Sequence, residues 1–134
     1  MQQGDLALRE GRCVASMRPL TVRDDTSGWF TLGAAVERPL HELDVVLMRK
    51  DPPFDMEYVY TTYLLEQAES RGSLVVNRPA ALRDANEKVY TAWFPEVCPP
   101  TLVSRNHIDI SEFIDAQGDV ILKPLDGMGG ASIF

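Results

Sequence analysis

The apolar positions of the chain divide it into an N-terminal part of short segments and a later part with longer periodic elements. Residues 5–10 and 12–16 flank Gly11, which predicts two short strands joined by a hairpin or sharp turn. Residues 19–25 and 29–37 predict further short strands on either side of a Thr-Ser-Gly turn. The chain contains no internal repeat and no low-complexity segment.

Residues 43–77 carry the strongest pattern. A continuous apolar run in 43–51 predicts a strand covered on both faces, as in a parallel sheet. The segment that follows predicts an amphipathic helix, with Asp55 as its N-cap and Gly72 as its stop. The apolar positions of this helix are Met56, Val59, Tyr60, Tyr63, Leu64 and Ala68. Residues 73–77 predict the next parallel strand, which makes a βαβ unit.

A second helix is predicted to open at Pro79 and to run to about Phe94, or to break near Asn86. Prolines at 95, 99 and 100 mark a linker, so a domain boundary falls either there or at the break. The remaining elements are predicted as a strand at 101–105, a helix at 106–118, a strand at 119–125 and another strand that starts at 131–134.

Composition limits the classes of function. The 134 residues suffice for one domain, with 45% hydrophobic and 25% charged residues. The formal charge of −7 argues against a general nucleic-acid binder or a binder of anionic membranes. Cys13 and Cys98 lack the spacing of a zinc site, and free thiols in a reducing cytosol are expected. No apolar run reaches the ~18 residues of a membrane span, and residues 1–12 are polar and carry no apolar region of the kind found in signal peptides.

The sequence VILKPLDGMGGASIF, residues 120–134, raises the question of phosphate binding. A Walker A loop places its lysine after the glycines, whereas Lys123 precedes them. A dinucleotide fingerprint needs a following helix, whereas a strand is predicted here. Two interpretations stay open: a glycine-rich hairpin loop laid over phosphates, and a simple turn.

Four motifs taken together are similar to bacterial glutathione synthetases, which are ATP-grasp ligases. The motifs are LMRKDPPFD, VVNRP, LRDANEKVYTAWFP and ILKPLDGMGGASIF, and the resemblance covers nearly the whole chain. It implies that ATP lies between two α+β lobes and phosphorylates the carboxylate of γ-glutamylcysteine. The amine of glycine then attacks the acyl phosphate, giving glutathione, ADP and phosphate. Mg²⁺ would bridge the phosphates.

The resemblance also implies site residues. The ATP-binding residues would be Lys88, Lys123, Asp126, Gly127, Met128, Gly129 and Gly130. Arg49, Asp51 and Asn77 follow the two predicted parallel strands, at the edge where such sheets bind ligands, and are expected to bind the peptide substrate. Simpler interpretations are an exposed loop with a local ion pair for Arg49, a turn before Pro79 for Asn77 and a solvated helix position for Lys88. No protein nucleophile is needed, and no metal ligand is assigned within the chain.

The predicted fold class is α/β. Residues 1–87 are expected to form a pre-ATP-grasp domain with a parallel sheet, and residues 88–134 the start of an ATP-grasp lobe. The resemblance implies a fragment that lacks an N-terminal βα unit and a C-terminal half with the adenine-binding and magnesium-binding segments, so the chain alone is expected to be inactive. It further implies a cytoplasmic homo-oligomer, a tetramer, with small-molecule substrates. Alternatives are an ATP-grasp ligase for another amine and a non-catalytic nucleotide-binding module.

Overall fold

The computed structural model describes residues 1–51, 53–130 and 132–134. The N-terminal part forms an antiparallel sheet in the order β1-β2-β5, from β1 (Leu6–Arg9), β2 (Arg12–Met17) and β5 (Val36–Pro39). The hairpin predicted around Gly11 is confirmed, since Arg9 pairs with Arg12 and Gly11 has a φ of 72°. Glycine suits this turn because its backbone enters the left-handed region without steric cost.

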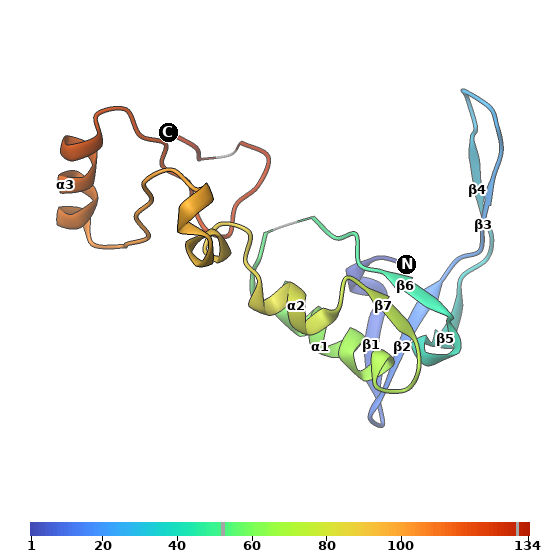
Figure 1. Ribbon diagram of the computed structural model, residues 1–134. Coiled ribbons are helices and arrows are strands. Elements are labelled where there is room, and N and C mark those ends of the chain that lie inside the picture. Colours follow the sequence, from blue (N-terminus) through green and yellow to red (C-terminus); the bar gives the residue numbers. More distant parts are fainter. Residues whose placement is uncertain (52, 131) are drawn as a thin grey trace.

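A second hairpin leaves this sheet and stands away from the rest of the molecule (Figure 1). It consists of β3 (Leu20–Val22) and β4 (Phe30–Leu32), which pair only with each other in an antiparallel ladder. The strand predicted at 19–25 is therefore confirmed, whereas the segment predicted at 29–37 is divided: its first part forms β4, and its last two residues belong to β5 of the three-stranded sheet.

The predicted βαβ unit is also confirmed. Strands β6 (Val45–Leu47) and β7 (Leu74–Val76) pair in parallel and are connected by helix α1 (Met56–Glu69). The Asp55 carboxylate caps the helix by accepting a 2.8 Å hydrogen bond from the backbone N–H of Tyr58. The helix ends at Glu69, and Gly72 with a φ of 113° completes the turn into β7.

The predicted apolar face of α1 is only partly confirmed, since Ala68 is buried in the core and Leu64 packs against it. Of the six apolar positions chosen for it, Met56, Tyr60 and Tyr63 are 57%, 58% and 49% exposed. The face that packs against the sheets consists of Tyr58, Thr61, Thr62, Leu65 and Ala68. Two threonines can be buried because their hydroxyls donate to carbonyls of the same helix, Thr61 to Glu57 at 2.9 Å and Thr62 to Val59 at 2.6 Å.

The prediction that residues 43–51 form a strand covered on both faces is also wrong for the described residues. Val46 and Val75 face α1 and are 3% and 2% exposed. The opposite face of the two-stranded sheet is open. Its side chains, from Val45, Leu47, Leu74 and Val76, are 48%, 63%, 57% and 40% exposed. A continuous apolar run shows that both faces of a strand are apolar. It does not show that the described residues cover both of them.

The hydrophobic core lies where α1 crosses the antiparallel sheet and the β6–β7 pair. Its buried members are Cys13, Ala15, Leu40, Val46, Leu65, Ala68 and Val75. Ser73 adds a buried polar link, because its hydroxyl lies 2.7 Å from the carbonyl oxygen of Leu40 and 2.9 Å from that of Leu43.

Helix α2 (Pro79–Asp84) begins at the predicted proline and ends before Asn86, so the predicted break is confirmed and the run to Phe94 is not. Arg83 connects α2 to α1 by two interactions. Its guanidinium forms a 2.7 Å ion pair with Glu66 and a cation–π contact with Tyr63, 4.4 Å from the ring centre. Short 3₁₀ helices follow at Tyr90–Trp93 and Pro95–Val97.

Helix α3 (His107–Gln117) is confirmed with both of its predicted ends. Asn106 accepts a 3.0 Å hydrogen bond from the backbone N–H of Ile108, and Gly118 with a φ of 78° ends the helix. The helix lies at the end of the molecule opposite the β3–β4 hairpin (Figure 1).

The strands predicted at 101–105 and 119–125 are not formed within the described residues. An extended segment becomes a strand only when a neighbour completes its hydrogen-bond ladder. Leu122 and Phe134 do exchange both backbone hydrogen bonds, at 2.8 and 3.1 Å, which makes a single rung. The predicted strand at 131–134 cannot be judged as a whole, because Ala131 lies outside the described residues.

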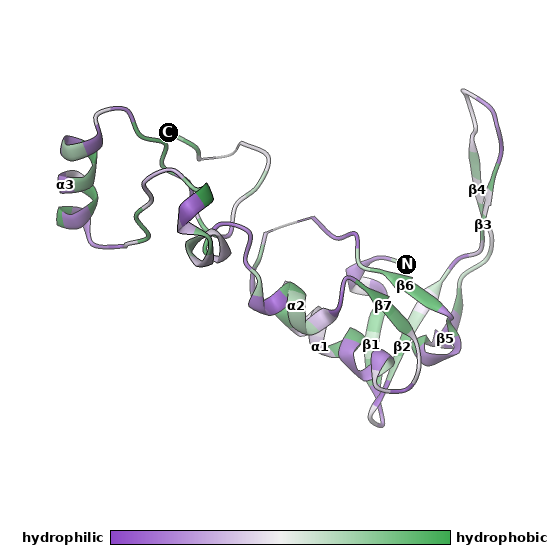
Figure 2. Cartoon of the chain, in the orientation of Figure 1, coloured by the Kyte–Doolittle hydropathy of each residue, from purple (hydrophilic) through white to green (hydrophobic). Residues whose placement is uncertain are grey.

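The molecule is open in shape. Its accessible surface is 10003 Å², whereas a compact protein of this length exposes about 7,000 Å². Figure 2 shows apolar residues on strands and helices of both halves of the chain, and many of the large ones are exposed, among them Leu47, Trp93 and Ile108. Among the helices that the structure describes, none is long and apolar enough to cross a membrane.

Candidate functional site

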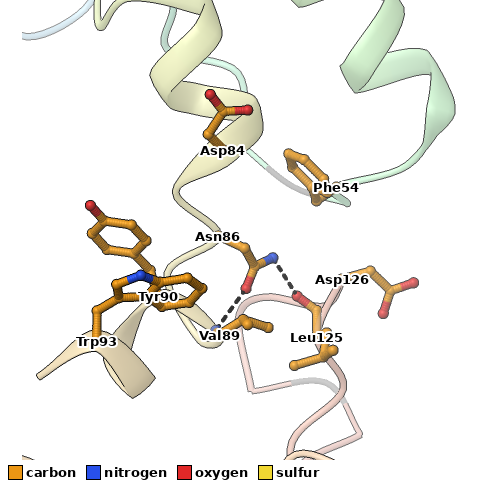
Figure 3. A pocket seen from close by; sticks show the side chains of 8 residues that line it. All are labelled: Phe54, Asp84, Asn86, Val89, Tyr90, Trp93, Leu125 and Asp126. Carbon is orange, nitrogen blue, oxygen red and sulfur yellow. Dashed lines mark hydrogen bonds between the residues drawn. The ribbon is translucent and has the colours of Figure 1, made fainter. Parts of the chain in front are cut away.

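A tight turn after α2 positions the first lysine of the site. The side-chain oxygen of Asn86 accepts hydrogen bonds from the backbone N–H groups of Lys88 at 3.0 Å and Val89 at 3.1 Å. Such a turn suits an asparagine, whose short side chain can satisfy the backbone that a helix would otherwise use. The Asn86 amide nitrogen donates in the opposite direction, to the carbonyl oxygen of Leu125 at 3.3 Å (Figure 3).

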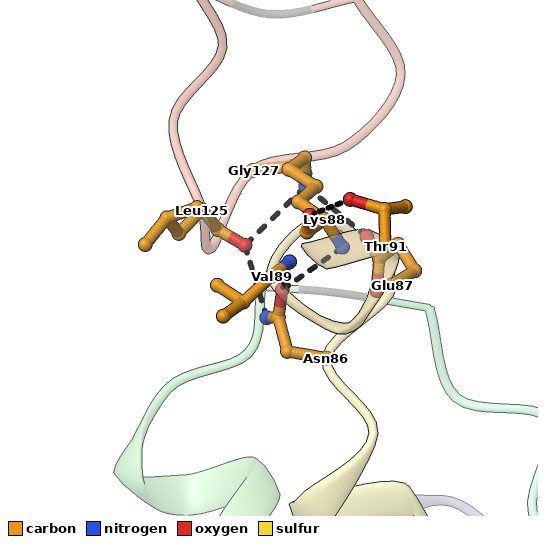
Figure 4. Close-up of polar contacts among 7 residues, drawn as sticks. All are labelled: Asn86, Glu87, Lys88, Val89, Thr91, Leu125 and Gly127. Atoms are coloured by element: carbon orange, nitrogen blue, oxygen red, sulfur yellow. Dashed lines mark hydrogen bonds and ion pairs between the residues drawn. The ribbon is translucent and has the colours of Figure 1, made fainter. Parts of the chain in front are cut away.

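Lys88 extends from this turn to the glycine loop. Its ammonium donates to the carbonyl oxygens of Gly127 at 2.6 Å and Leu125 at 3.3 Å, and lies 3.1 Å from the Glu87 carboxylate (Figure 4). The side chain is only 22% exposed. Lys88 is therefore not the solvated helix residue of the simpler interpretation, because it lies in a turn and makes charge-assisted hydrogen bonds to a segment distant in sequence.

These contacts form one wall of a pocket of about 210 Å³. The pocket is lined by Glu87, Lys88, Lys123, Pro124, Gly127, Met128, Gly129, Gly130 and Ile133. It thus brings together six of the seven residues expected to bind ATP. The seventh, Asp126, is exposed and lines a neighbouring pocket instead.

The glycine loop adopts a backbone conformation that favours glycine. Gly129 and Gly130 have φ values of 71° and 80°, in the region that L side chains rarely adopt. A Cβ added at either position would meet no atom within 4 Å, so the space beside the loop is open. Backbone N–H groups without a neighbouring Cβ can approach the oxygens of an anion closely.

The charges of the pocket balance in favour of an anion. Two lysines, Lys88 and Lys123, face it with one carboxylate, Glu87. The hydrogen bond from Lys88 lowers the pKa of Glu87, so the carboxylate is ionised at neutral pH and offsets part of the lysine charge. Lys123 is exposed and has no ion pair or side-chain hydrogen bond among the described residues, so its ammonium is available to a ligand.

A second pocket, of about 350 Å³, lies on the other side of Asn86 (Figure 3). Its lining residues are Phe54, Asp84, Asn86, Val89, Tyr90, Trp93, Leu125 and Asp126. The rings of Tyr90 and Trp93 stack with their centres 5.3 Å apart. The sequence analysis did not predict this pocket, although two aromatic residues three positions apart, directly after Lys88, were a signal for it.

The expected peptide-binding residues lie elsewhere. The backbone N–H of Met48 donates to the carbonyl of Val76 at 2.7 Å, so Arg49 and Asn77 leave the parallel pair at the same edge. Arg49, Asp51 and Asn77 are all exposed, and none of them lines either pocket. Among the described residues Arg49 and Asp51 form no ion pair, so the local ion pair of the simpler interpretation is not formed.

A backbone contact connects this edge to the glycine loop. The N–H of Phe54, in the segment between β6 and α1, donates to the carbonyl oxygen of Asp126 at 3.2 Å. The sequence did not predict this role of Phe54, because a backbone hydrogen bond does not depend on the type of side chain. Within residues 1–51, 53–130 and 132–134, no group of three His, Cys, Asp or Glu side chains could hold a metal ion.

Two parts of the chain match known protein families. Residues 1–83 match the sequence profile of the prokaryotic glutathione synthetase N-terminal domain, and residues 87–134 match that of the prokaryotic glutathione synthetase ATP-grasp domain. The chain belongs to the prokaryotic glutathione synthetase family.

Curated members of this family match along the whole of the chain. The glutathione synthetases of Yersinia pestis, Shewanella oneidensis and Pseudomonas putida are 58%, 59% and 62% identical to it over 134 residues. Each match covers 100% of this chain and 42% of the relative. The chain therefore spans less than half the length of the curated relatives that it matches.

Proposed function

We propose that the chain provides the peptide-binding edge and the phosphate-binding loop of an ATP-dependent ligase that joins glycine to γ-glutamylcysteine. The observation that carries the proposal is the pocket in which Lys88 donates to the carbonyl of Gly127, with Lys123 and two left-handed glycines beside it. Residues 1–87 would form the pre-ATP-grasp domain, and residues 88–134 would begin the ATP-grasp lobe.

At the nucleotide end, the backbone N–H groups of the glycine loop would hold phosphate oxygens. Lys88 and Lys123 would offset the negative charge that shifts between the phosphates during transfer. Met128 would cover the phosphates from the loop, and Asp126 would fix the turn through its backbone contact with Phe54. A pocket of about 210 Å³ suits phosphate groups, and the adenine would lie outside the residues that line it.

At the peptide end, Arg49 would bind a carboxylate of γ-glutamylcysteine. Asp51 would pair with its ammonium group, and Asn77 would hydrogen-bond its amide. All three side chains are exposed and leave the parallel strands at the edge where open α/β sheets receive ligands.

The described residues do not fit a magnesium site, since they hold no cluster of carboxylates. Its ligands would come from other parts of the polypeptide, and the 134 residues alone would not catalyse the reaction.

The reaction needs no protein nucleophile. An oxygen of the peptide carboxylate attacks the γ-phosphorus of ATP, and ADP leaves. The nitrogen of glycine then attacks the acyl carbon, loses a proton, and expels phosphate as the amide bond forms. The enzyme would act in the cytoplasm as a homo-oligomer, a tetramer, with small-molecule substrates and without nucleic acid or membrane.

The test uses the intact gene product that contains these residues, incubated with ATP, Mg²⁺, γ-glutamylcysteine and glycine. We expect equal amounts of glutathione and ADP, and no glutathione when glycine is omitted. Equal or faster ADP release with another amine, such as alanine, would replace this proposal with a ligase of different specificity. The absence of ADP release with any amine would leave a nucleotide-binding module.

A further inference from the structure

Asn86 lies between the turn that carries Lys88 and the segment that begins the glycine loop, and it is bonded to both. Its amide oxygen accepts from the backbone N–H groups of Lys88 at 3.0 Å and Val89 at 3.1 Å, while its amide nitrogen donates to the carbonyl oxygen of Leu125 at 3.3 Å. Its backbone carbonyl accepts from the N–H of Tyr90 at 2.8 Å. One residue therefore connects the turn, the 3₁₀ helix after it and the loop.

Asparagine is well matched to this set of contacts. Its short side chain presents an acceptor and a donor from the same amide group. An aspartate would face the carbonyl oxygen of Leu125 with a second acceptor in place of a donor. A serine hydroxyl could accept in the turn, but its side chain is too short to reach the loop as well. The chemistry at position 86 therefore suits a link between turn and loop, and not the turn alone.

Asn86 and Lys88 share an acceptor in the loop. The carbonyl oxygen of Leu125 lies 3.3 Å from the Asn86 amide nitrogen and 3.3 Å from the Lys88 ammonium (Figure 4). A carbonyl oxygen has two lone pairs and can accept from both donors. When a phosphate draws the ammonium away, the bond from Asn86 can stay in place. The link between turn and loop therefore does not depend on where the lysine ammonium lies.

We propose that Asn86 is a positioning residue for the binding of ATP phosphates, and that it acts through Lys88. Asn86 lines the pocket of about 350 Å³ and not the phosphate pocket, so it acts from behind the lysine. By fixing the backbone of Lys88 against the carbonyl of Leu125, it holds the ammonium beside Gly127 before a ligand arrives. A site that is already ordered loses less entropy on binding. The inference rests on the nucleotide role proposed for this pocket, but not on the reaction.

The test is a double-mutant cycle in the intact gene product, measured by titration calorimetry with a non-hydrolysable ATP analogue. Asn86→Ala should raise the dissociation constant about three- to tenfold, which is the usual effect of having to order one long side chain on binding. In the background of Lys88→Met, the same substitution should change the dissociation constant by less than about twofold. The reason is that no ammonium is then left for Asn86 to position.

Adenosine distinguishes positioning from a general loss of structure. It lacks phosphates, so Asn86→Ala should leave the dissociation constant of adenosine unchanged. The matched control is Asn106→Ala, which removes the cap that accepts from the N–H of Ile108 and lies outside both pockets. This control should leave the affinity for the ATP analogue unchanged. If Asn86→Ala does not fold, Asn86→Ser carries the same cycle, with an expected rise of about threefold because the link to Leu125 is lost.

Unchanged affinity of the Asn86 variant for the ATP analogue would overturn the proposal. An equal loss with adenosine, an equal loss in Asn106→Ala, or an effect that persists in full beside Lys88→Met would also overturn it. These outcomes differ from a failure of the proposed function. A gene product that binds the analogue as expected but forms no glutathione would contradict the reaction alone, whereas a gene product that does not bind the analogue would contradict both proposals.

Discussion

The ammonium of Lys88 donates a 2.6 Å hydrogen bond to the carbonyl oxygen of Gly127, although 39 positions separate the two residues. This contact holds the first part of the glycine loop against the turn that follows α2. The lysine therefore has a partner in the described chain, and a bound phosphate would compete with that carbonyl for the same ammonium.

The variant Lys88→Met in the intact gene product should weaken ATP binding. Methionine keeps most of the side-chain volume but loses the charge, and a lost charge-assisted hydrogen bond corresponds to roughly ten- to hundredfold in affinity. Titration calorimetry with a non-hydrolysable ATP analogue measures this. Lys50→Met is the matched control, because Lys50 is exposed and lies outside both pockets. Equal effects of the two variants would show that Lys88 has no special role.

The variant Gly129→Val tests the glycine loop. The added side chain would meet no neighbour within 4 Å, but a β-branched residue resists the φ of 71°. It would also obstruct the approach of the backbone to phosphate. We expect turnover to fall by at least about tenfold, equivalent to ~1.4 kcal/mol of transition-state stabilisation.

The melting temperature without nucleotide should hardly change in this variant, because the loop is exposed. Gly4→Val serves as a control, since Gly4 also has open space and lacks a positive φ. Normal turnover in Gly129→Val would mean that the loop is a simple turn.

The variant Arg49→Ala addresses the peptide-binding edge. If Arg49 binds a carboxylate, its loss should raise the KM for γ-glutamylcysteine roughly tenfold or more and leave the KM for ATP unchanged. Arg105→Ala, an exposed arginine after the proline-rich linker, should change neither constant. Steady-state kinetics with each substrate varied in turn measures both constants. An unchanged KM for the dipeptide would show that Arg49 is a surface residue with no role in substrate binding.

The thiols should differ in reactivity and in their effect on stability. Burial raises the pKa of Cys13 from 9.0 to about 11, whereas Cys98 is half-buried. In the native chain at pH 8, iodoacetamide should modify Cys98 first, and Cys13 only after unfolding. Mass spectrometry of timed samples measures the order.

The pH dependence of stability follows from the same shift. Because the folded pKa of Cys13 lies above the unfolded value of 9.0, its contribution to stability is complete below pH 9 and is lost as the pH rises toward 11. The variant Cys13→Ala should lose less stability than the native chain over this interval in urea titrations. Equal losses would show that the thiol is not responsible.

Much of the local structure could be predicted from the residues themselves. Asp55 and Asn106 cap α1 and α3, Pro79 opens α2, and Gly118 ends α3, because each depends on interactions within a few positions of the chain. The parallel order of β6 and β7 likewise followed from two apolar runs separated by a helix. The strands expected at 101–105 and 119–125 failed for the opposite reason, since a ladder needs a partner that local pattern cannot supply.

The sequence alone determined the family and the position of the glycine loop, because motif order and glycine positions are properties of the linear chain. Tertiary structure decided which face of α1 is buried, since its threonines satisfy their hydroxyls within the helix and its tyrosines then remain outside. Tertiary structure also brought Lys88 to Gly127 and separated Arg49 from both pockets. Hydrogen bonds between distant segments form only when packing brings their donors and acceptors within reach. The spacing of residues along the chain therefore could not predict these contacts.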